Sequence, residues 1–259
     1  MRKHSPLIAA LSVFMGLTQS HAIHAQDLSL KPWTVSSGTA RVSLIELYSS
    51  EGCSSCPNAD AWLSALRASP ELWKSFVPIE FHVDYWNRLG WTDRFSRQEF
   101  TQRQRAYAAR WGSSSVYTPG FVRNGEEWQR SADLSPTLDS TTGASNGVLQ
   151  ATQIGPRKFR VSFETTMASG DGWTFHGALL GNGLKSEVKS GENAGRILAH
   201  EFVVLALAEK TTDKIHTSKS VEIELEPRGN AQPKTWSAAF WVSKGNELQP
   251  LQAVGGDLK

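Results

Sequence analysis

The sequence predicts an α/β domain followed by an antiparallel β-rich domain, and three observations support this fold class. Residues 42–48 form a nearly continuous apolar run, which is typical of a strand buried on both faces of a parallel sheet. From Pro57 the apolar residues recur at the spacing of one helix face, and Pro70 ends this element. Beyond residue 147 apolar and polar residues alternate over short segments, which indicates half-buried antiparallel strands.

Two cysteines, Cys53 and Cys56, stand between the first strand and the helix, and they are the only cysteines in the 259 residues. Unpaired backbone N–H groups and the positive end of the helix dipole stabilise a thiolate at such a position. This lowers the pKa of a cysteine and makes it a nucleophile. A disulfide that closes so short a loop stabilises a fold little, so reactivity explains the pair better. The sequence therefore predicts thiol–disulfide exchange.

A second strand is predicted at residues 77–83, and a right-handed crossover makes it parallel to the first. Open parallel sheets hold their sites beyond the C-terminal ends of the strands, which places His82 and Asp84 near the cysteines. These two side chains are candidates for proton transfer to Cys56, although a histidine inside an apolar strand is also typical of a packing residue. Glu51, just before the cysteines, is a candidate for raising the thiol pKa by like charge.

A proline-marked bend follows a second predicted helix. Thr118-Pro119 stands at the head of a short strand, where a proline interrupts pairing, and a cis bond is expected there. The dipeptide at 124–125, Asn-Gly, is a strong signal for a hairpin turn. Trp86 is assigned to the core or to the wall of a groove, and it is a candidate for contact with substrate.

Taken together, these motifs resemble the thioredoxin superfamily: a strand, C-x-x-C at a helix start, a second strand, a helix, and Thr-Pro before a hairpin. The strings ELYSSEGCSSCPNADAWL, FHVDYWNRLGWTDRFS and FTQRQRAYAARWGSSSVYTPG are similar to the DUF1223 family of exported, thioredoxin-like bacterial proteins. The resemblance implies an α/β thioredoxin-like domain followed by an antiparallel β-rich, sandwich-like C-terminal domain.

By position, the resemblance implies a role for each residue of the motif. Cys53 is the attacking thiol, Cys56 is the resolving thiol, and Pro119 is the cis proline packed against the pair. Thr118 offers its backbone to a bound peptide or thiol. The sequence departs from many thioredoxins in having Leu47 where they carry a buried acid and a Ser-Ser dipeptide between the cysteines. Both departures bear on the redox direction.

The N-terminus predicts export to the periplasm or secretion. Arg2 and Lys3 precede an apolar run at 7–17 and then small and polar residues, with cleavage after Ala22 or Ala25. No later stretch is long and apolar enough to predict a membrane span. The expected segments are a signal peptide (1–25), a lead-in (26–40), a thioredoxin-like domain (41–130), a linker (131–147) and a β-rich domain (148–259).

Charge and residue types restrict the function further. The formal net charge is +2, and removal of the signal takes away two basic residues and no acid. The mature chain is therefore neutral, and no nucleic-acid partner is expected.

The favoured function is an exported thiol–disulfide oxidoreductase with no cofactor and no metal, acting on protein or small-molecule thiols and disulfides. The alternatives are a redox-silent binding or scaffold protein and a copper-handling chaperone. A permanent local disulfide is a further reading of the pair, and metal holding would need two more soft ligands.

Overall fold

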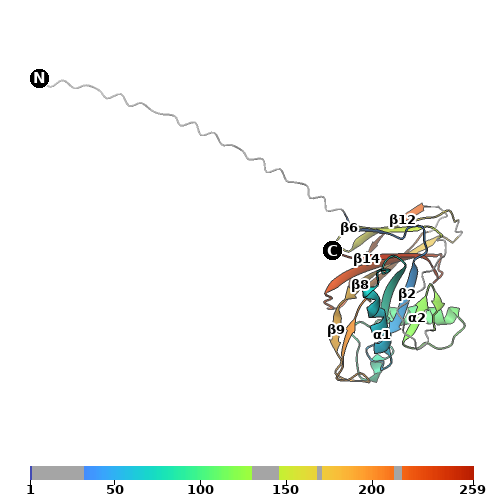
Figure 1. Ribbon diagram of the computed structural model, residues 1–259, viewed down its shortest axis with the longest axis vertical. Helices are drawn as coiled ribbons and strands as arrows, with labels where there is room; N and C mark the ends of the chain where they lie inside the picture. Colours follow the sequence, from blue (N-terminus) through green and yellow to red (C-terminus); the bar gives the residue numbers. More distant parts are fainter. Residues whose placement is uncertain (2–31, 130–145, 168–170, 213–217) are drawn as a thin grey trace. The chain divides into compact units, whose positions relative to one another are not determined.

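A mixed eight-stranded sheet runs through the part of the chain from Pro32 to Lys259, as Figure 1 shows for the computed structural model. The structure describes residues 1, 32–129, 146–167, 171–212 and 218–259. Nearly all of the predicted signal peptide, most of the predicted linker and residues 26–31 of the lead-in lie outside these residues. In the described part of the chain, every helix is too short or too polar to span a bilayer.

The eight-stranded sheet joins strands from both halves of the chain. Its spatial order is β14-β13-β8-β11-β3-β2-β4-β5. The pairs β2–β3 and β3–β11 are parallel, and the other pairs are antiparallel. The strands are β2 (Ser43–Ser49), β3 (Phe76–His82), β4 (Gly120–Arg123), β5 (Glu126–Glu127), β8 (Trp173–Asn182), β11 (Val203–Thr212), β13 (Thr235–Lys244) and β14 (Pro250–Asp257).

A second, four-stranded antiparallel sheet has the order β1-β6-β7-β12. Alternate residues of β7 point inward, so Phe159 and Phe163 are buried against Phe240 and Trp173 of the large sheet. A separate two-stranded ribbon pairs β9 with β10. These strands are β1 (Thr34–Ser36), β6 (Val148–Gly155), β7 (Lys158–Glu164), β12 (Ser218–Glu224), β9 (Leu184–Glu187) and β10 (Ile197–His200).

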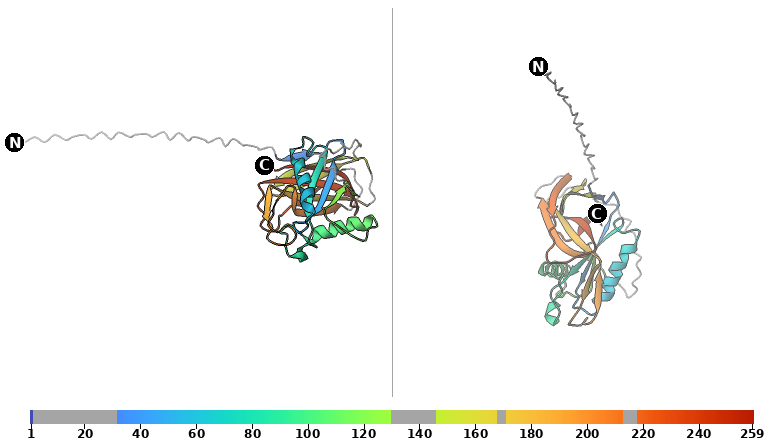
Figure 2. Two further views of the ribbon diagram at one scale, coloured as in Figure 1. Left: turned by 60° about the horizontal axis from the view of Figure 1, so that its bottom comes forward. Right: turned by 90° about the vertical axis from the view of Figure 1, so that its left-hand side faces the viewer.

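Two α-helices cover opposite faces of the large sheet, as the right-hand view of Figure 2 shows. Helix α1 (Cys56–Ala65) continues into a 3-10 turn (Leu66–Ala68), and α2 (Gln98–Arg110) follows a second 3-10 turn (Asn87–Leu89). This arrangement explains why all seven residues of β2 are buried, since each of its faces is covered by other elements.

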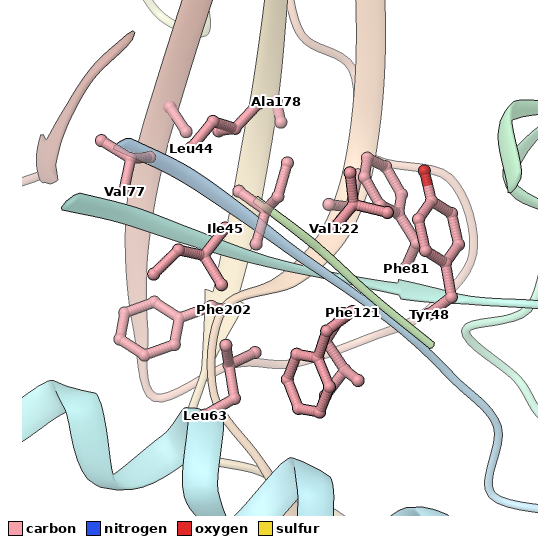
Figure 3. Close-up of a cluster of buried hydrophobic side chains, with 14 of the residues drawn as sticks. Leu44, Ile45, Tyr48, Leu63, Val77, Phe81, Phe121, Val122, Ala178 and Phe202 are labelled. Atoms are coloured by element: carbon pink, nitrogen blue, oxygen red, sulfur yellow. The ribbon is translucent and has the colours of Figure 1, made fainter. Parts of the chain in front are cut away.

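The side chains that hold each helix come from alternate positions of the strands. On one face, Leu63 of α1 lies beneath Ile45, Phe121 and Phe202 (Figure 3). On the other face, Tyr107 of α2 packs against Tyr48, with the ring centroids 6.4 Å apart. Figure 3 shows Phe81 beside Tyr48, and their rings stack. The burial of these side chains fixes α1 and therefore the position of the cysteine turn before it.

A buried ion pair holds α2 to β2. Two nitrogens of the Arg103 guanidinium donate to the Glu46 carboxylate, at 2.8 and 3.0 Å. The hydroxyls of Tyr48 and Tyr107 donate to the same carboxylate, at 2.9 and 2.6 Å. The indole ring of Trp241 lies 5.2 Å from the guanidinium carbon. Burial alone would lower the pKa of Arg103, but the Glu46 charge outweighs burial and holds this pKa well above its usual value.

The predicted fold class is wrong. The chain is mostly β-sheet, with 45% strand, 14% helix and two α-helices among the described residues, and it does not have an α/β thioredoxin-like fold. The segments around the cysteines do form a strand, a helix and a parallel strand, at 43–49, 56–65 and 76–82. The physical reason for the error is pairing between the two halves. In the structure β3 pairs with β11, so long antiparallel strands from the second half extend its sheet.

Candidate functional site

The cysteine pair lies in the turn between β2 and α1. Cys53 and Cys56 form a disulfide, with their Cα atoms 5.4 Å apart. Cys56 is the first residue of α1, and the N-cap, Ser55, makes no side-chain capping hydrogen bond to the helix. Cys53 and Cys56 are 0% and 1% exposed, whereas Ser54 and Ser55 between them are exposed. The pair is therefore at a helix start, as predicted, but beneath the surface.

The proline-marked bend lies beside Cys53. The Thr118–Pro119 bond is cis. The carbonyl oxygen of Thr118 is 3.8 Å from Cys53 Sγ, and the indole N–H of Trp86 donates to Thr118 Oγ1 at 2.7 Å. Trp86 also crowds Gly52, where a Cβ atom would come 3.1 Å from Trp86 Cβ. The structure thus brings three of the predicted site residues from distant segments together around one sulfur.

A loop from the second half of the chain fastens the cysteine turn. The buried Asn193 side-chain amide donates to two carbonyl oxygens, those of Glu51 and Cys53, both at 2.9 Å. The carboxylate of Glu192 accepts a hydrogen bond from the backbone N–H of Ser54 at 2.9 Å. Sequence reasoning missed both residues. The glycines of this loop indicate a tight turn, but nothing in its sequence indicates that it contacts the cysteines. Asn193 and Cys53 are 140 residues apart along the chain.

A cluster of buried ionisable side chains lies on the α1 side of the sheet, next to the cysteine turn. We call it the buried histidine cluster, and its members are Glu51, Asp60, Glu80, His82, Asp93 and His200. The two imidazole centroids are 5.1 Å apart. His82 Nδ1 is hydrogen-bonded to Asp93 Oδ2 at 2.7 Å, and His200 Nδ1 is hydrogen-bonded to Asp60 Oδ2 at 2.5 Å.

The electrostatics of the cluster reflect burial and close charges. Burial would lower the pKa of His82, but Asp93 and Glu80 outweigh it, so this pKa stands well above its usual value. Burial would also lower the pKa of His200, but the neighbouring carboxylates of Asp60 and Glu51 raise it to about 10. Burial raises the pKa of Glu80, and the Asp60 charge adds to this. Such shifted pKa values are frequent at functional sites.

The candidates for proton transfer and pKa tuning face other partners. His82 is bonded to Asp93, and Asp84 accepts a hydrogen bond from Thr101 Oγ1 at 2.5 Å. Among the described residues, no hydrogen bond joins either side chain to a cysteine. The carboxylate of Glu51 accepts from Trp91 Nε1 at 2.7 Å and faces the histidine cluster. Sequence reasoning identified Glu51 and His82 separately but not the cluster that contains them.

Loss of the Asn193 amide is expected to expose the disulfide more often. Asn193→Ala removes two hydrogen bonds to the cysteine turn, each with a net stabilisation of about 0.5–1.5 kcal/mol. We therefore expect the disulfide of the folded variant to be reduced by dithiothreitol about tenfold faster, as followed by alkylation of the released thiols. Asn246→Ala, at an exposed position in another loop, is the matched control. Equal reduction rates for Asn193→Ala and the wild type would show that the loop does not cover the pair.

Comparison with known proteins places this site in a family. A family model described as "Protein of unknown function (DUF1223)" matches residues 44–243, which include the cysteines, the proline bend and the Asn193 loop. The chain belongs to the DUF1223 family. This match confirms the DUF1223 part of the resemblance found in the sequence, and it does not extend to the thioredoxin superfamily. No curated protein matches the sequence.

Two solved structures share the fold of this DUF1223 protein. A protein from Agrobacterium tumefaciens is 23% identical with a TM-score of 0.58, and the match covers 85% of this chain and 94% of that chain. HBP35 of Porphyromonas gingivalis is 13% identical, also with a TM-score of 0.58, and the match covers 85% of this chain and 76% of that chain. At these identities the likeness concerns the fold alone.

Proposed function

We propose that this DUF1223 protein is an exported thiol–disulfide oxidoreductase and that Cys53 and Cys56 are its reacting pair. The observation that carries the proposal is the disulfide at the start of α1 with the Thr118 carbonyl 3.8 Å from Cys53 Sγ. That carbonyl lies next to the sulfur that a substrate would approach. Export is proposed from the pattern of the N-terminal sequence alone.

The exchange proceeds in two balanced steps. In the reduced protein, the Cys53 thiolate attacks one sulfur of a substrate disulfide, and the other substrate sulfur leaves as a thiolate. The Cys56 thiolate then attacks Cys53 Sγ, breaks the mixed disulfide and releases the second substrate sulfur. The Cys53–Cys56 disulfide forms and two electrons pass to the substrate. The reverse sequence oxidises a substrate dithiol.

Access to Cys53 requires a movement of the cover over the turn. Cys53 is 0% exposed, Asn193 is hydrogen-bonded to its carbonyl oxygen, and Trp86 packs on the neighbouring Gly52. Glu192 holds the turn at the surface, where its carboxylate accepts a hydrogen bond from the backbone N–H of the exposed Ser54. Opening of this loop uncovers the cysteine turn without disturbing β2 or α1, so a substrate can reach the sulfur while the fold remains intact.

A trapping experiment tests the proposal. In Cys56→Ser the resolving thiol is absent, so the mixed disulfide formed by Cys53 cannot be released by the second step. We expect the variant, expressed in a bacterial envelope, to accumulate covalent adducts that disappear on reduction, detected on non-reducing gels and by mass spectrometry. Cys53→Ser is the matched control and should form markedly fewer adducts. Equal adduct levels in the two variants, or none in either, would contradict the assignment of Cys53 as the attacking thiol.

The burial of both sulfurs favours a second candidate function, that of a redox-silent binding protein in which the disulfide only fixes the turn. Under that function the disulfide would resist reduction until the protein unfolds. If the protein is a redox-silent binding protein, the Cys56→Ser variant would also form no adducts. The trapping experiment therefore separates the two candidates.

A further inference from the structure

We propose that the buried histidine cluster binds one divalent transition-metal ion, through Nε2 of His82, Nε2 of His200 and a carboxylate oxygen of Glu80. The potential ligand atoms of these three buried residues all lie within 4.8 Å of one another. They come from two different elements: Glu80 and His82 share one face of β3, and His200 ends β10. The fold thus brings together ligands that are more than a hundred residues apart.

The atoms that point into the cluster have no hydrogen-bond partner among the described residues. They are both carboxylate oxygens of Glu80, Nε2 of His82, Nε2 of His200 and Oε1 of Glu51. All four side chains are at most 2% exposed. A buried polar atom without a partner is costly, and most buried polar atoms in proteins are paired. Several such atoms converging on one place are explained by an ion that they share.

The other side of each imidazole is already fixed. Asp93 holds Nδ1 of His82, and Asp60 holds Nδ1 of His200. With Nδ1–H donating to a carboxylate, Nε2 is the nitrogen that releases its proton when a metal ion binds. Metal-binding histidines are oriented in this way, by a carboxylate on the far nitrogen that also raises the basicity of the ligand.

The spacing of His82 and Glu80 fits a tetrahedral ion. His82 Nε2 is 3.5 Å from Glu80 Oε1, and His200 Nε2 is 3.4 Å from Glu51 Oε1. A tetrahedral zinc ion with bonds of about 2.1 Å holds its ligand atoms about 3.4 Å apart. Glu51 lies beside His200 but is not in the set of residues whose ligand atoms are all within 4.8 Å of one another, so it is not among the proposed ligands. Imidazole and carboxylate ligands suit zinc and neighbouring divalent ions rather than Cu(I), which prefers thiolates.

The charges of the cluster also suit a divalent cation. Four carboxyl groups, those of Glu51, Asp60, Glu80 and Asp93, surround two imidazoles in the interior. Buried negative charge requires compensation by a partner or a metal. This site is independent of thiol exchange, since the cysteines are not among its ligands, although Glu51 and Asp60 lie on either side of the cysteine turn.

Metal titration of the full-length, oxidised protein after treatment with a chelator tests the proposal. We expect one equivalent of Zn²⁺ to bind in calorimetry, with a rise in melting temperature. We expect Co²⁺ to give the absorption of a site with nitrogen and oxygen ligands and no sulfur charge-transfer band. Glu80→Gln keeps the shape of the side chain and should weaken Zn²⁺ binding by about a hundredfold or more, as should His200→Gln. Circular dichroism establishes that each variant is folded.

Two controls separate this site from other ways of binding zinc. His176→Asn changes a buried histidine of β8 that stacks on Trp241 and is not in the cluster, and it should leave Zn²⁺ affinity unchanged. The double variant Cys53→Ser/Cys56→Ser should also bind one equivalent. The proposal is overturned if the wild type binds no Zn²⁺, if folded Glu80→Gln binds as tightly as the wild type, or if removal of the cysteines abolishes binding.

Discussion

Replacement of Arg103 by methionine is expected to lower the free energy of unfolding by about 3–5 kcal/mol, because it leaves the buried Glu46 carboxylate without its counter-charge. The Arg103 side chain is 9% exposed and that of Glu46 is 1% exposed, so water cannot replace the guanidinium. The hydroxyls of Tyr48 and Tyr107 remain as donors but carry no charge. Urea denaturation of the wild type and the variant measures the loss.

Two further variants make this result specific to the ion pair. Arg105→Met, at an exposed position of the same helix, should change the free energy of unfolding by less than about 0.5 kcal/mol. Glu46→Gln combined with Arg103→Met removes the stranded charge, so it should recover part of the loss. A loss below about 1 kcal/mol for Arg103→Met alone would show that the Glu46 carboxylate does not depend on this partner.

Replacement of Trp241 by alanine is expected to lower the free energy of unfolding by about 3–5 kcal/mol, the range for truncation of a large buried aromatic side chain. Trp241 is 0% exposed in the middle of β13. Its ring stacks on His176 with the centroids 5.1 Å apart, and it faces the Arg103 guanidinium. The change opens a cavity between β13 and the Arg103 side chain of α2. Thermal or urea unfolding measures the effect.

The contact between Trp241 and Arg103 predicts that their substitutions are not additive. The double variant Trp241→Ala/Arg103→Met should lose less stability than the sum of the single losses, because each change removes part of the same contact. Ile197→Ala is the control for a large apolar side chain outside the core, since Ile197 is 68% exposed. Strict additivity would show that the two side chains stabilise the fold independently.

Local structure near the cysteines could be predicted from the sequence, since it depends on neighbouring residues. The apolar run, the helical spacing after Pro57 and the Thr-Pro dipeptide each report on a few residues, and the elements they predict are present. Strand pairing is different, because it depends on which distant strand offers a matching edge. Periodicity indicates that β3 and β11 are strands but not that they pair in one sheet.

The candidate site could be predicted only in part for the same reason. Cys53, Cys56 and Thr118 carry local signals, and the structure brings them together. Asn193 and His200 reach the site from loops and strands of the second half, where an asparagine or a histidine has no distinguishing pattern. In β3, the apolar neighbours predict a buried strand, and His82 is a candidate from the sequence, but nothing in the pattern indicates that Glu80 faces the same cluster.

Controlled reduction of the folded protein tests most directly whether Cys53 and Cys56 form a redox-active pair. The protein is equilibrated in glutathione or dithiothreitol redox buffers, its free thiols are alkylated and counted by mass spectrometry, and circular dichroism monitors the fold. Thiol–disulfide exchange predicts reversible reduction of the folded protein at a potential between about −270 and −120 mV, the range of proteins that exchange disulfides. A potential below about −300 mV, or reduction only after unfolding, would contradict the proposed function.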